Sequence, residues 1–237
     1  MHASENTNPG KRFFMSWSGG KDSCLSLYRM LTQGHTCASL FTMVDPDHGF
    51  SRSHGLTTAM LLAQTSALGL PLTTASATWE SYEPHFIQVA QSFASQGIQA
   101  AVFGDIDLQA HKDWEERICA ACGLTPYLPL WGEHRETLVR EFIDLGFQAL
   151  IVTVDERQMP IDYLGKTLDH ALVDRMLNQG IDPCGEYGEF HTFVFDGPLF
   201  RRSVYIHSRE PRQIDHHHVL IMHPGELVPA DKGREHA

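Results

Sequence analysis

Apolar residues in the first half of the chain alternate between short continuous runs and stripes at helical spacing. The run that begins at Phe13 predicts a buried strand, and Leu25, Tyr28 and Leu31 then occupy one face of a predicted helix. A second apolar run follows over 37–44. Strand, helix and strand in this order are typical of a parallel sheet, whose ligands bind at the carboxyl ends of the strands.

The same alternation continues until the pattern changes near the middle of the chain. It predicts helices over 56–69, 84–97 and 111–123, and strands over 70–76 and 99–103. The stretch 128–132 then breaks the rhythm, and we place the boundary between two domains there. The expected domains are 11–128 and 129–224, with flexible ends at 1–10 and 225–237.

Elements in a less regular order follow this boundary. The pattern predicts a helix over 135–145, a strand over 149–154, a helix over 167–178 and two antiparallel strands over 202–208 and 215–222. Helices and strands that do not alternate regularly are typical of an α+β domain. We therefore predict an α/β fold in which a parallel-sheet domain is followed by a smaller C-terminal α+β domain.

Composition limits the classes of protein that fit this chain. Its 237 residues are 42% hydrophobic, which is enough for a substantial core. The formal charge is −11 and Lys and Arg do not cluster, which argues against a nucleic-acid partner. Five cysteines, a polar stretch over 1–12 and the lack of an apolar stretch of membrane-spanning length lead us to expect a cytoplasmic protein without a signal peptide.

The stretch Ser-Gly-Gly-Lys-Asp-Ser at 18–23 lies between the first strand and the first helix. At such a turn, backbone N–H groups and the helix dipole favour a bound anion. Gly19 and Gly20 permit backbone conformations closed to other residues and let the main chain approach a ligand rich in oxygen. We interpret residues 18–23 as a phosphate-binding loop; the alternative is a glycine turn whose polar residues share no ligand.

Four side chains of the phosphate-binding loop suit this interpretation. Ser18 and Ser23 offer hydroxyl donors, and Lys21 adds positive charge. Asp22 could hold a magnesium ion between phosphates, since Mg²⁺ prefers carboxylate and phosphate oxygens. A P-loop of the GxxxxGK[ST] type is excluded, because Asp22 follows Lys21 where that motif needs Ser or Thr.

Two further segments are expected to face the phosphate-binding loop. The loop 45–55 leaves the second strand, and its His54 could contact phosphate or substrate, or stand in solvent. Gly104 and Asp105 end the next buried strand, which places them at the same edge of the sheet. Asp105 or Asp107 could hold magnesium or orient an acceptor, or could only cap the following helix.

A second cluster of glycines and acids lies over 182–198. Glu186 and Glu189 stand three residues apart ahead of an aromatic-rich strand, and they could converge on a cation or an incoming amine. The alternative is a glycine-rich hairpin turn with exposed acids. The consecutive histidines at 216–218 do not predict a zinc site, because successive strand residues point to opposite faces.

The phosphate-binding loop resembles the pyrophosphate loop of the ATP pyrophosphatases, and the chain as a whole resembles the diphthine–ammonia ligase family. The other shared motifs, in chain order, are Gly104-Asp105-Ile106, Trp114-Glu115-x-Arg117, Leu130-Trp131 and Cys184-Gly185-Glu186-x-Gly188-Glu189-Phe190-His191-Thr192. These motifs extend over almost the whole chain. The resemblance implies an ATP-binding domain of the adenine nucleotide alpha hydrolase-like type and a smaller substrate domain that carries the glycine and glutamate motif at a shared cleft.

The resemblance also implies a reaction with ATP and Mg²⁺ as cofactors. In that family ATP adenylates a carboxylate, ammonia displaces AMP, and an amide forms. The residues at hand suit this chemistry, and we assign catalytic roles to Lys21, Asp22, Glu186 and Glu189. Asp22 is the expected metal ligand, and our hypothesis is that the two glutamates deprotonate and steer ammonia. The form of the last motif resembles the bacterial branch, so we expect a small-molecule or protein-borne carboxylate as acceptor, such as a corrinoid side chain.

Two other functions are compatible with the same loop. One is ATP-dependent sulfur transfer to RNA, with Cys119, Cys122 and Cys184 as a persulfide or iron–sulfur set; the first two are also spaced like core residues of a helix. The other is a non-catalytic ATP sensor that closes its two domains on the nucleotide. The oligomeric state, including a homodimer, stays open at this point.

Overall fold

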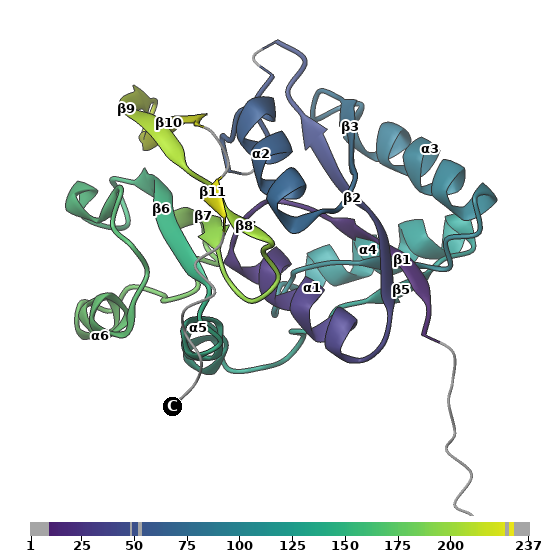
Figure 1. The fold of residues 1–237 in the computed structure, drawn as a ribbon, viewed down its shortest axis with the longest axis horizontal. Coiled ribbons are helices and arrows are strands. Elements are labelled where there is room, and N and C mark those ends of the chain that lie inside the picture. The colour runs from purple at the N-terminus through teal and green to yellow at the C-terminus, as the bar shows by residue number, and fades with distance from the viewer. Residues whose placement is uncertain (1–9, 48, 52–53, 226–227, 230–237) are drawn as a thin grey trace, which may run out of the picture.

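A computed structural model of the chain describes residues 10–47, 49–51, 54–225 and 228–229. The flexible ends expected at 1–10 and 225–237 lie almost wholly outside these residues. The first half of the chain builds one sheet and the second half builds another, with helices packed against both (Figure 1). No helix within the described ranges has the length and apolar character needed to span a membrane.

The first sheet is parallel and has the strand order β3-β2-β1-β4-β5. Its strands are β1 (Arg12–Ser16), β2 (Thr36–Val44), β3 (Leu72–Ser76), β4 (Ala100–Val102) and β5 (Thr125–Tyr127). The helices between them are α1 (Lys21–Thr32), α2 (Thr58–Leu68), α3 (Tyr82–Ser95) and α4 (Gln109–Cys122). The predicted parallel α/β domain is confirmed, and β5 is an edge strand that the sequence pattern did not predict.

Alternating side chains of β1 divide the core into two layers. Phe13 and Met15 pack into the cluster that contains α1 and α2, whereas Phe14 packs into the cluster that contains α3 and α4. All three side chains are fully buried. A central strand needs apolar residues on both faces when helices cover both sides of its sheet. The helices therefore occupy the faces, and the ends of the strands are left to meet a ligand.

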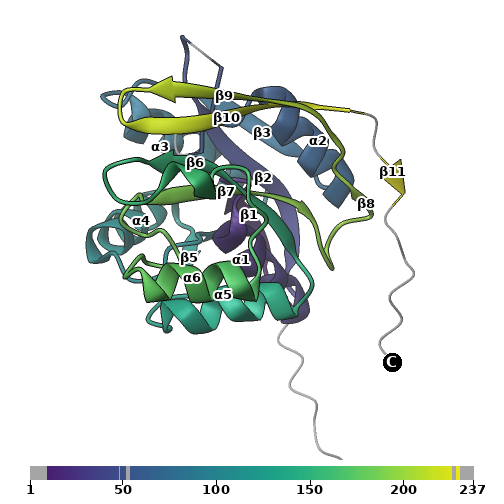
Figure 2. The same ribbon diagram turned by 90° about the vertical axis from the view of Figure 1, so that its left-hand side faces the viewer.

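The second half forms an antiparallel sheet with the strand order β7-β6-β10-β9. Its elements in chain order are α5 (Arg135–Asp144), β6 (Gln148–Asp155), the short 3-10 helix η1 (Ile161–Tyr163), α6 (His170–Asn178), β7 (Phe190–Asp196), β9 (Ile206–Ile214) and β10 (His217–Pro224). The short strands β8 (Arg202–Ser203) and β11 (Val228–Pro229) pair separately. Figure 2 shows the four-stranded sheet stacked over α6 and α5, which contact each other. The smaller α+β domain is confirmed.

Two boundaries in this half differ from the sequence pattern. The strand predicted over 202–208 is divided between β8 and β9. The helix predicted over 167–178 begins later, because the Asp169 side chain accepts a hydrogen bond from Leu172 N at 2.7 Å and caps the helix there. In both places turn and cap chemistry decides the boundary, and apolar periodicity does not report it.

Gln64 of α2 joins the two halves of the chain from inside the core. Its buried side chain accepts a hydrogen bond from Trp17 Nε1 at 2.9 Å and donates to Gly19 O at 2.9 Å and to Val194 O at 2.6 Å. Gly19 O also accepts from Val194 N at 3.0 Å. One glutamine thus ties the turn after β1 to strand β7 of the second sheet.

Replacing Gln64 with Leu tests this link. The substitution removes the buried partner of Trp17 Nε1 and of Val194 O, and we expect the free energy of unfolding to fall by about 3 kcal/mol. Urea unfolding followed by circular dichroism measures the loss. The control is Gln91→Leu on the exposed side of α3, which should change the stability by less than about 0.5 kcal/mol. Equal losses in the two variants would contradict the link.

Candidate functional site

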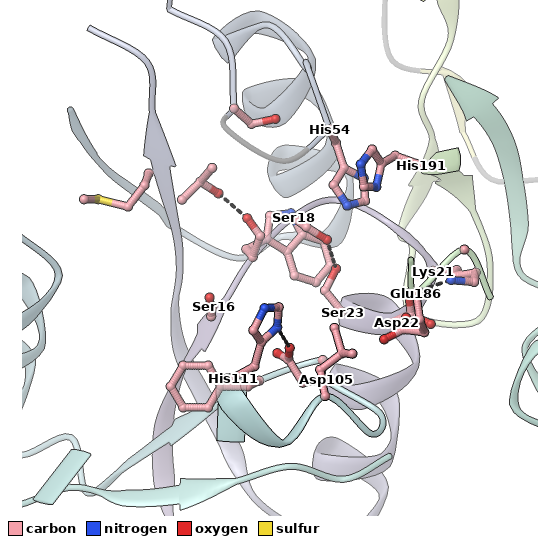
Figure 3. A pocket seen from close by; sticks show the side chains of 18 of the residues that line it. Ser16, Ser18, Lys21, Asp22, Ser23, His54, Asp105, His111, Glu186 and His191 are labelled. Carbon is pink, nitrogen blue, oxygen red and sulfur yellow. Dashed lines mark hydrogen bonds and ion pairs between the residues drawn. The ribbon is translucent and has the colours of Figure 1, made fainter. Parts of the chain in front are cut away.

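A cavity of about 560 Å³ lies at the carboxyl ends of β1, β2 and β4, and the segment that leads into β7 lines its other side (Figure 3). Its lining combines the aromatic side chains of Phe41, Phe86, Phe103 and Trp114 with the polar phosphate-binding loop. A cavity that is mostly apolar with a few polar groups at one place is typical of a small-molecule site. Its position is the one that a parallel sheet predicts.

Gly19 and Gly20 let the phosphate-binding loop pack closely against the rest of the protein. Gly19 has a φ of +81°, and a Cβ there would lie 2.8 Å from Gln64 Oε1. A Cβ at Gly20 would lie 2.4 Å from His54 Cε1. Glycine at the first position is therefore required by the left-handed backbone as well as by the space, and at the second by the space alone.

The phosphate-binding loop ends at the first turn of α1. Gly20 is the N-cap of this helix and has no side chain to accept from the N–H groups of the first turn. Lys21 N donates instead to Thr192 Oγ1 of β7 at 3.0 Å, and the hydroxyls of Ser18 and Ser23 lie 3.1 Å apart. The next N–H groups of the turn, with the helix dipole behind them, favour an anion at this end of the helix.

Lys21 is buried between the two domains. Its Nζ donates to Asp22 Oδ2 at 2.7 Å and to Cys184 O. Burial lowers the pKa of Lys21, but the charge and hydrogen bond of Asp22 and the nearby acidic groups of Cys184 and Glu186 together outweigh burial, and the pKa ends above its ordinary value. Lys21 therefore stays charged in the cavity wall, where Asp22 and the second domain hold its ammonium group.

The two glutamates of the second motif have different surroundings. Glu186 lines the cavity near Lys21 and Asp22 (Figure 3). Burial raises the pKa of Glu186 to about 8, and the charge of Asp22 adds to the effect. Glu189 is 7% exposed, accepts a hydrogen bond from Tyr187 N at 3.1 Å, and is not among the described residues that line the cavity. The alternative interpretation, a hairpin turn with exposed acids, therefore fits neither Glu186 nor Glu189.

Gly104 and Asp105 lie beside the phosphate-binding loop, as their position after β4 predicts. A Cβ at Gly104 would lie 3.1 Å from Ser23 N, so the two loops are in direct contact. Asp105 lines the cavity and is not a helix cap, because the N-cap of α4 is Leu108. Asp107 is not among the described residues that line the cavity, and its carboxylate pairs with Arg135 at 2.7 Å.

Asp105 forms a cluster with two residues of α4 that the sequence did not mark as site residues. His111 Nδ1 donates to Asp105 Oδ1 at 2.7 Å. Burial raises the pKa of Asp105, but hydrogen bonds from His111 and Glu115 outweigh it, and the pKa is lowered. Burial raises the pKa of Glu115 to about 11, and its Oε2 has no hydrogen-bond partner within the described chain. The spacing of four between His111 and Glu115, which puts both on one helix face, is the signal that could have found them.

His54 is part of the cavity wall. Its ring lies 4.6 Å from the ring of His191, measured between centroids, and its Nδ1 donates to Thr192 O at 2.8 Å. Burial lowers the pKa of His54 to about 4 and lowers the pKa of His191 as well. Both imidazoles are neutral at pH 7, and His54 stands over Gly20 in the cavity wall instead of in solvent.

The three cysteines considered for sulfur transfer do not share one place. Cys119 packs in the core cluster of α3 and α4, whereas Cys184 packs in the other cluster. Cys122 Sγ contacts Ile87 O at 3.8 Å. Burial raises the pKa of all three thiols, which disfavours the reactive thiolate form. The positions of Cys119 and Cys122 agree with their interpretation as core residues of a helix.

The carboxylates of the cavity fit a magnesium ion that is shared with a ligand. Asp22, Asp105 and Glu186 all line the cavity, and the charges of Asp22 and Asp105 both raise the pKa of Glu186. A cation relieves such repulsion, and Mg²⁺ commonly takes one or two carboxylates together with phosphate oxygens. Throughout the described residues, no three His, Cys, Asp or Glu side chains stand close enough for a complete protein site.

Two family models match the chain. The model described as "Diphthamide synthase N-terminal domain" matches residues 11–126, and the one described as "Diphthamide synthase C-terminal domain" matches residues 134–223. The first match contains the phosphate-binding loop, and the second contains Glu186 and Glu189.

Curated diphthine–ammonia ligases are similar to this chain over most of their length. The diphthine–ammonia ligase of Mus musculus is 27% identical in an alignment of length 219 that covers 81% of this chain and 82% of that protein. The diphthine–ammonia ligase of Danio rerio is 28% identical in an alignment of length 222 that covers 81% of this chain and 85% of that protein. Among solved structures, a predicted subunit of tRNA methyltransferase from Methanocaldococcus jannaschii covers 79% of this chain and 98% of its own, with a TM-score of 0.44 and 15% identity.

The raised pKa of Glu186 predicts a pH dependence of stability. Between its ordinary pKa of 4.5 and about 8, the folded protein binds a proton at Glu186 that the unfolded chain has released, so stability falls as the pH rises. We expect the free energy of unfolding of the wild type, relative to Glu186→Gln, to fall by roughly 2 kcal/mol between pH 5 and pH 8, which allows for partial solvent screening. Urea unfolding at both pH values measures the difference, and a constant difference would contradict the burial of this carboxyl.

Proposed function

Because this chain belongs to the diphthamide synthase family, we propose that it is an ATP-dependent ligase that converts a carboxylate and ammonia into an amide. ATP adenylates the carboxylate and releases pyrophosphate, and ammonia then displaces AMP. One observation carries the proposal: the start of α1, with the phosphate-binding loop, and Glu186 of the second domain line the same cavity. An anion site and an acidic group thus meet where the two domains meet.

The cavity suits ATP in shape and chemistry. A volume of about 560 Å³ is in the range of small-molecule sites. The aromatic side chains of Phe41, Phe86 and Phe103 offer an apolar surface to the base, and the uncapped first turn of α1 offers N–H donors to the phosphates. In this placement the α-phosphate lies between the phosphate-binding loop and the second domain.

The groups of the phosphate-binding loop stabilise the charge that develops in the adenylation step. When the carboxylate attacks the α-phosphate, negative charge increases on the departing pyrophosphate. The hydroxyls of Ser18 and Ser23 and the N–H groups of α1 are held in place before the reaction, so they stabilise this charge without reorganisation. Asp22, together with Asp105, would hold Mg²⁺, which supplies further charge neutralisation at the phosphates when bound.

Glu186 is the residue that we assign to the nitrogen nucleophile. Ammonia must lose a proton when it attacks the acyl-adenylate, and a carboxyl whose pKa lies at about 8 accepts that proton more readily than an ordinary glutamate. Its negative form also attracts ammonium into the cavity. Glu189 supports the loop by accepting from Tyr187 N, and we assign it no contact with the substrate.

The acceptor that we propose is a small-molecule or protein-borne carboxylate, with a corrinoid side chain as one candidate. The curated relatives are named for diphthine and ammonia, and free ammonium is the nitrogen source that we propose here. A cytoplasmic location is part of the proposal, since all five cysteines are free thiols in the structure. A homodimer remains a proposal that gel filtration can test.

A product analysis tests the reaction. Protein incubated with Mg²⁺, ATP, ¹⁵N-labelled ammonium and a metabolite extract should release AMP and pyrophosphate, and mass spectrometry should find an amide that carries the label. Release of ADP in place of AMP would contradict the proposal. Absence of AMP with every acceptor would favour the ATP sensor.

Two matched variants test the role of Glu186. Glu186→Gln should bind ATP with unchanged affinity and lose amide formation by about 100-fold or more, the effect of losing a general base. Glu189→Gln should lose much less, because the amide oxygen of Gln still accepts from Tyr187 N. Retained turnover in Glu186→Gln would refute the assignment.

A further inference from the structure

Arg135, the first residue of α5, joins two loops that come from different domains. Its Nε and Nη2 donate to the two carboxylate oxygens of Asp107, at 2.8 and 2.7 Å. Its Nη1 donates to Asp182 Oδ2 at 2.6 Å. The side chain is only 17% exposed, and a guanidinium with a fixed fork of donors is well suited to bridging two carboxylates. The guanidinium of Arg135 therefore holds the loop after β4 and the loop before β7 together.

Asp182, in turn, organises the loop that carries Glu186. Its Oδ1 accepts from Cys184 N at 3.0 Å, and its Oδ2 accepts from Glu186 N at 3.0 Å. The same loop packs against Arg135 in two more ways. Cys184 Sγ donates to Arg135 O at 3.1 Å, and the guanidinium lies 4.4 Å from the centre of the Tyr187 ring. The loop thus surrounds Arg135 on several sides.

The phosphate-binding loop is held by other contacts. Gly19 O accepts from Val194 N and from Gln64, and Lys21 N donates to Thr192 Oγ1. None of these bonds involves Arg135. Lys21 Nζ also donates to Cys184 O of the loop 182–189, but the backbone bonds named above do not depend on that loop. Loss of Arg135 therefore acts on the position of the loop 182–189 and leaves the backbone of the phosphate-binding loop in place.

We infer that Arg135 is a positioning residue that holds Glu186 at the cavity. Without the guanidinium, the carboxylate of Asp182, 9% exposed, loses its counter-ion and no longer fixes the backbone of Cys184 and Glu186. The consequence for amide formation rests on the proposed function, whereas the consequence for the loop does not.

Arg29 offers a matched control. It also joins segments far apart in the chain, donating to Pro129 O at 2.9 Å, to Glu133 Oε2 at 2.9 Å and to Glu141 Oε1 at 3.2 Å. Its side chain is 18% exposed, almost the same as that of Arg135. Arg29 is not among the described residues that line the cavity, and its partners belong to the segment before and within α5. Loss of Arg29 removes a comparable clamp without touching the loop 182–189.

Amide hydrogen exchange on the full chain tests the inference. In Arg135→Met, the exchange rates of the Cys184 and Glu186 amides should rise about tenfold or more, because both lose a fixed acceptor. In Arg29→Met the same two rates should stay within about twofold of the wild type. Arg135→Lys, which keeps the charge but cannot bridge both carboxylates, should give intermediate rates and covers the case in which Arg135→Met does not fold. Equal rates in the Arg135→Met and Arg29→Met variants would overturn the inference.

Addition of Mg²⁺ and ATP separates this inference from the proposed function. In the wild type, amide exchange should slow in both the phosphate-binding loop and the loop 182–189. In Arg135→Met, amide exchange should slow in the phosphate-binding loop but not in the loop 182–189. The ATP affinity of this variant should stay within about threefold of the wild type. Slowing of the loop 182–189 in Arg135→Met to the wild-type extent would contradict the positioning role. No slowing in the wild-type phosphate-binding loop would count against ATP binding itself, whatever the two arginine variants show without nucleotide.

Discussion

The turn between β1 and α1 is fixed by strand β7 of the other domain, and the rest of the site depends on this contact. Gly19 O accepts from Val194 N and from Gln64, and Lys21 N donates to Thr192 Oγ1. These groups are buried, so each bond would have to be replaced by another partner before the domains could separate. The phosphate-binding loop and the strand that follows the Glu186 motif therefore form one unit. The nucleotide site that we propose therefore needs both domains.

The groups around the cavity are compatible with the binding of a polyanion such as ATP, which we propose, although the chain is acidic. The formal charge is −11, and Lys21 is held by Asp22 and by Cys184 O. In the proposed site, the attraction for phosphate therefore comes mainly from backbone N–H groups and the dipole of α1, both of which are local. The acidic side, with Asp105 and Glu186, faces the same space and suits cations such as magnesium and ammonium. The same cavity thus has N–H groups that suit phosphate and carboxylates that suit cations.

Local signals were sufficient to predict most of the fold and to predict that the segments around residues 18–23 and 104–105 lie together at one cavity. The phosphate-binding loop has a short pattern in a strand-turn-helix context, and the place of Gly104 follows from the rule that parallel strands end at one edge of a sheet. Contacts between domains could not be predicted in this way. The roles of Arg135 and Gln64 depend on residues 28 to 130 positions away in the chain, and no periodicity along the chain reports such contacts. The different surroundings of Glu186 and Glu189 arise from how the loop folds back on Asp182, which spacing alone does not show.

The central claim is that the first turn of α1 and the phosphate-binding loop hold the pyrophosphate part of ATP. The most direct measurement is a crystal structure with Mg²⁺ and a non-hydrolysable ATP analogue. The account predicts the β- and γ-phosphates within hydrogen-bond distance of the N–H groups of α1 and of the Ser18 and Ser23 hydroxyls, with Glu186 on the side of the α-phosphate. A nucleotide bound with its phosphates elsewhere, and the phosphate-binding loop without an anion, would contradict it.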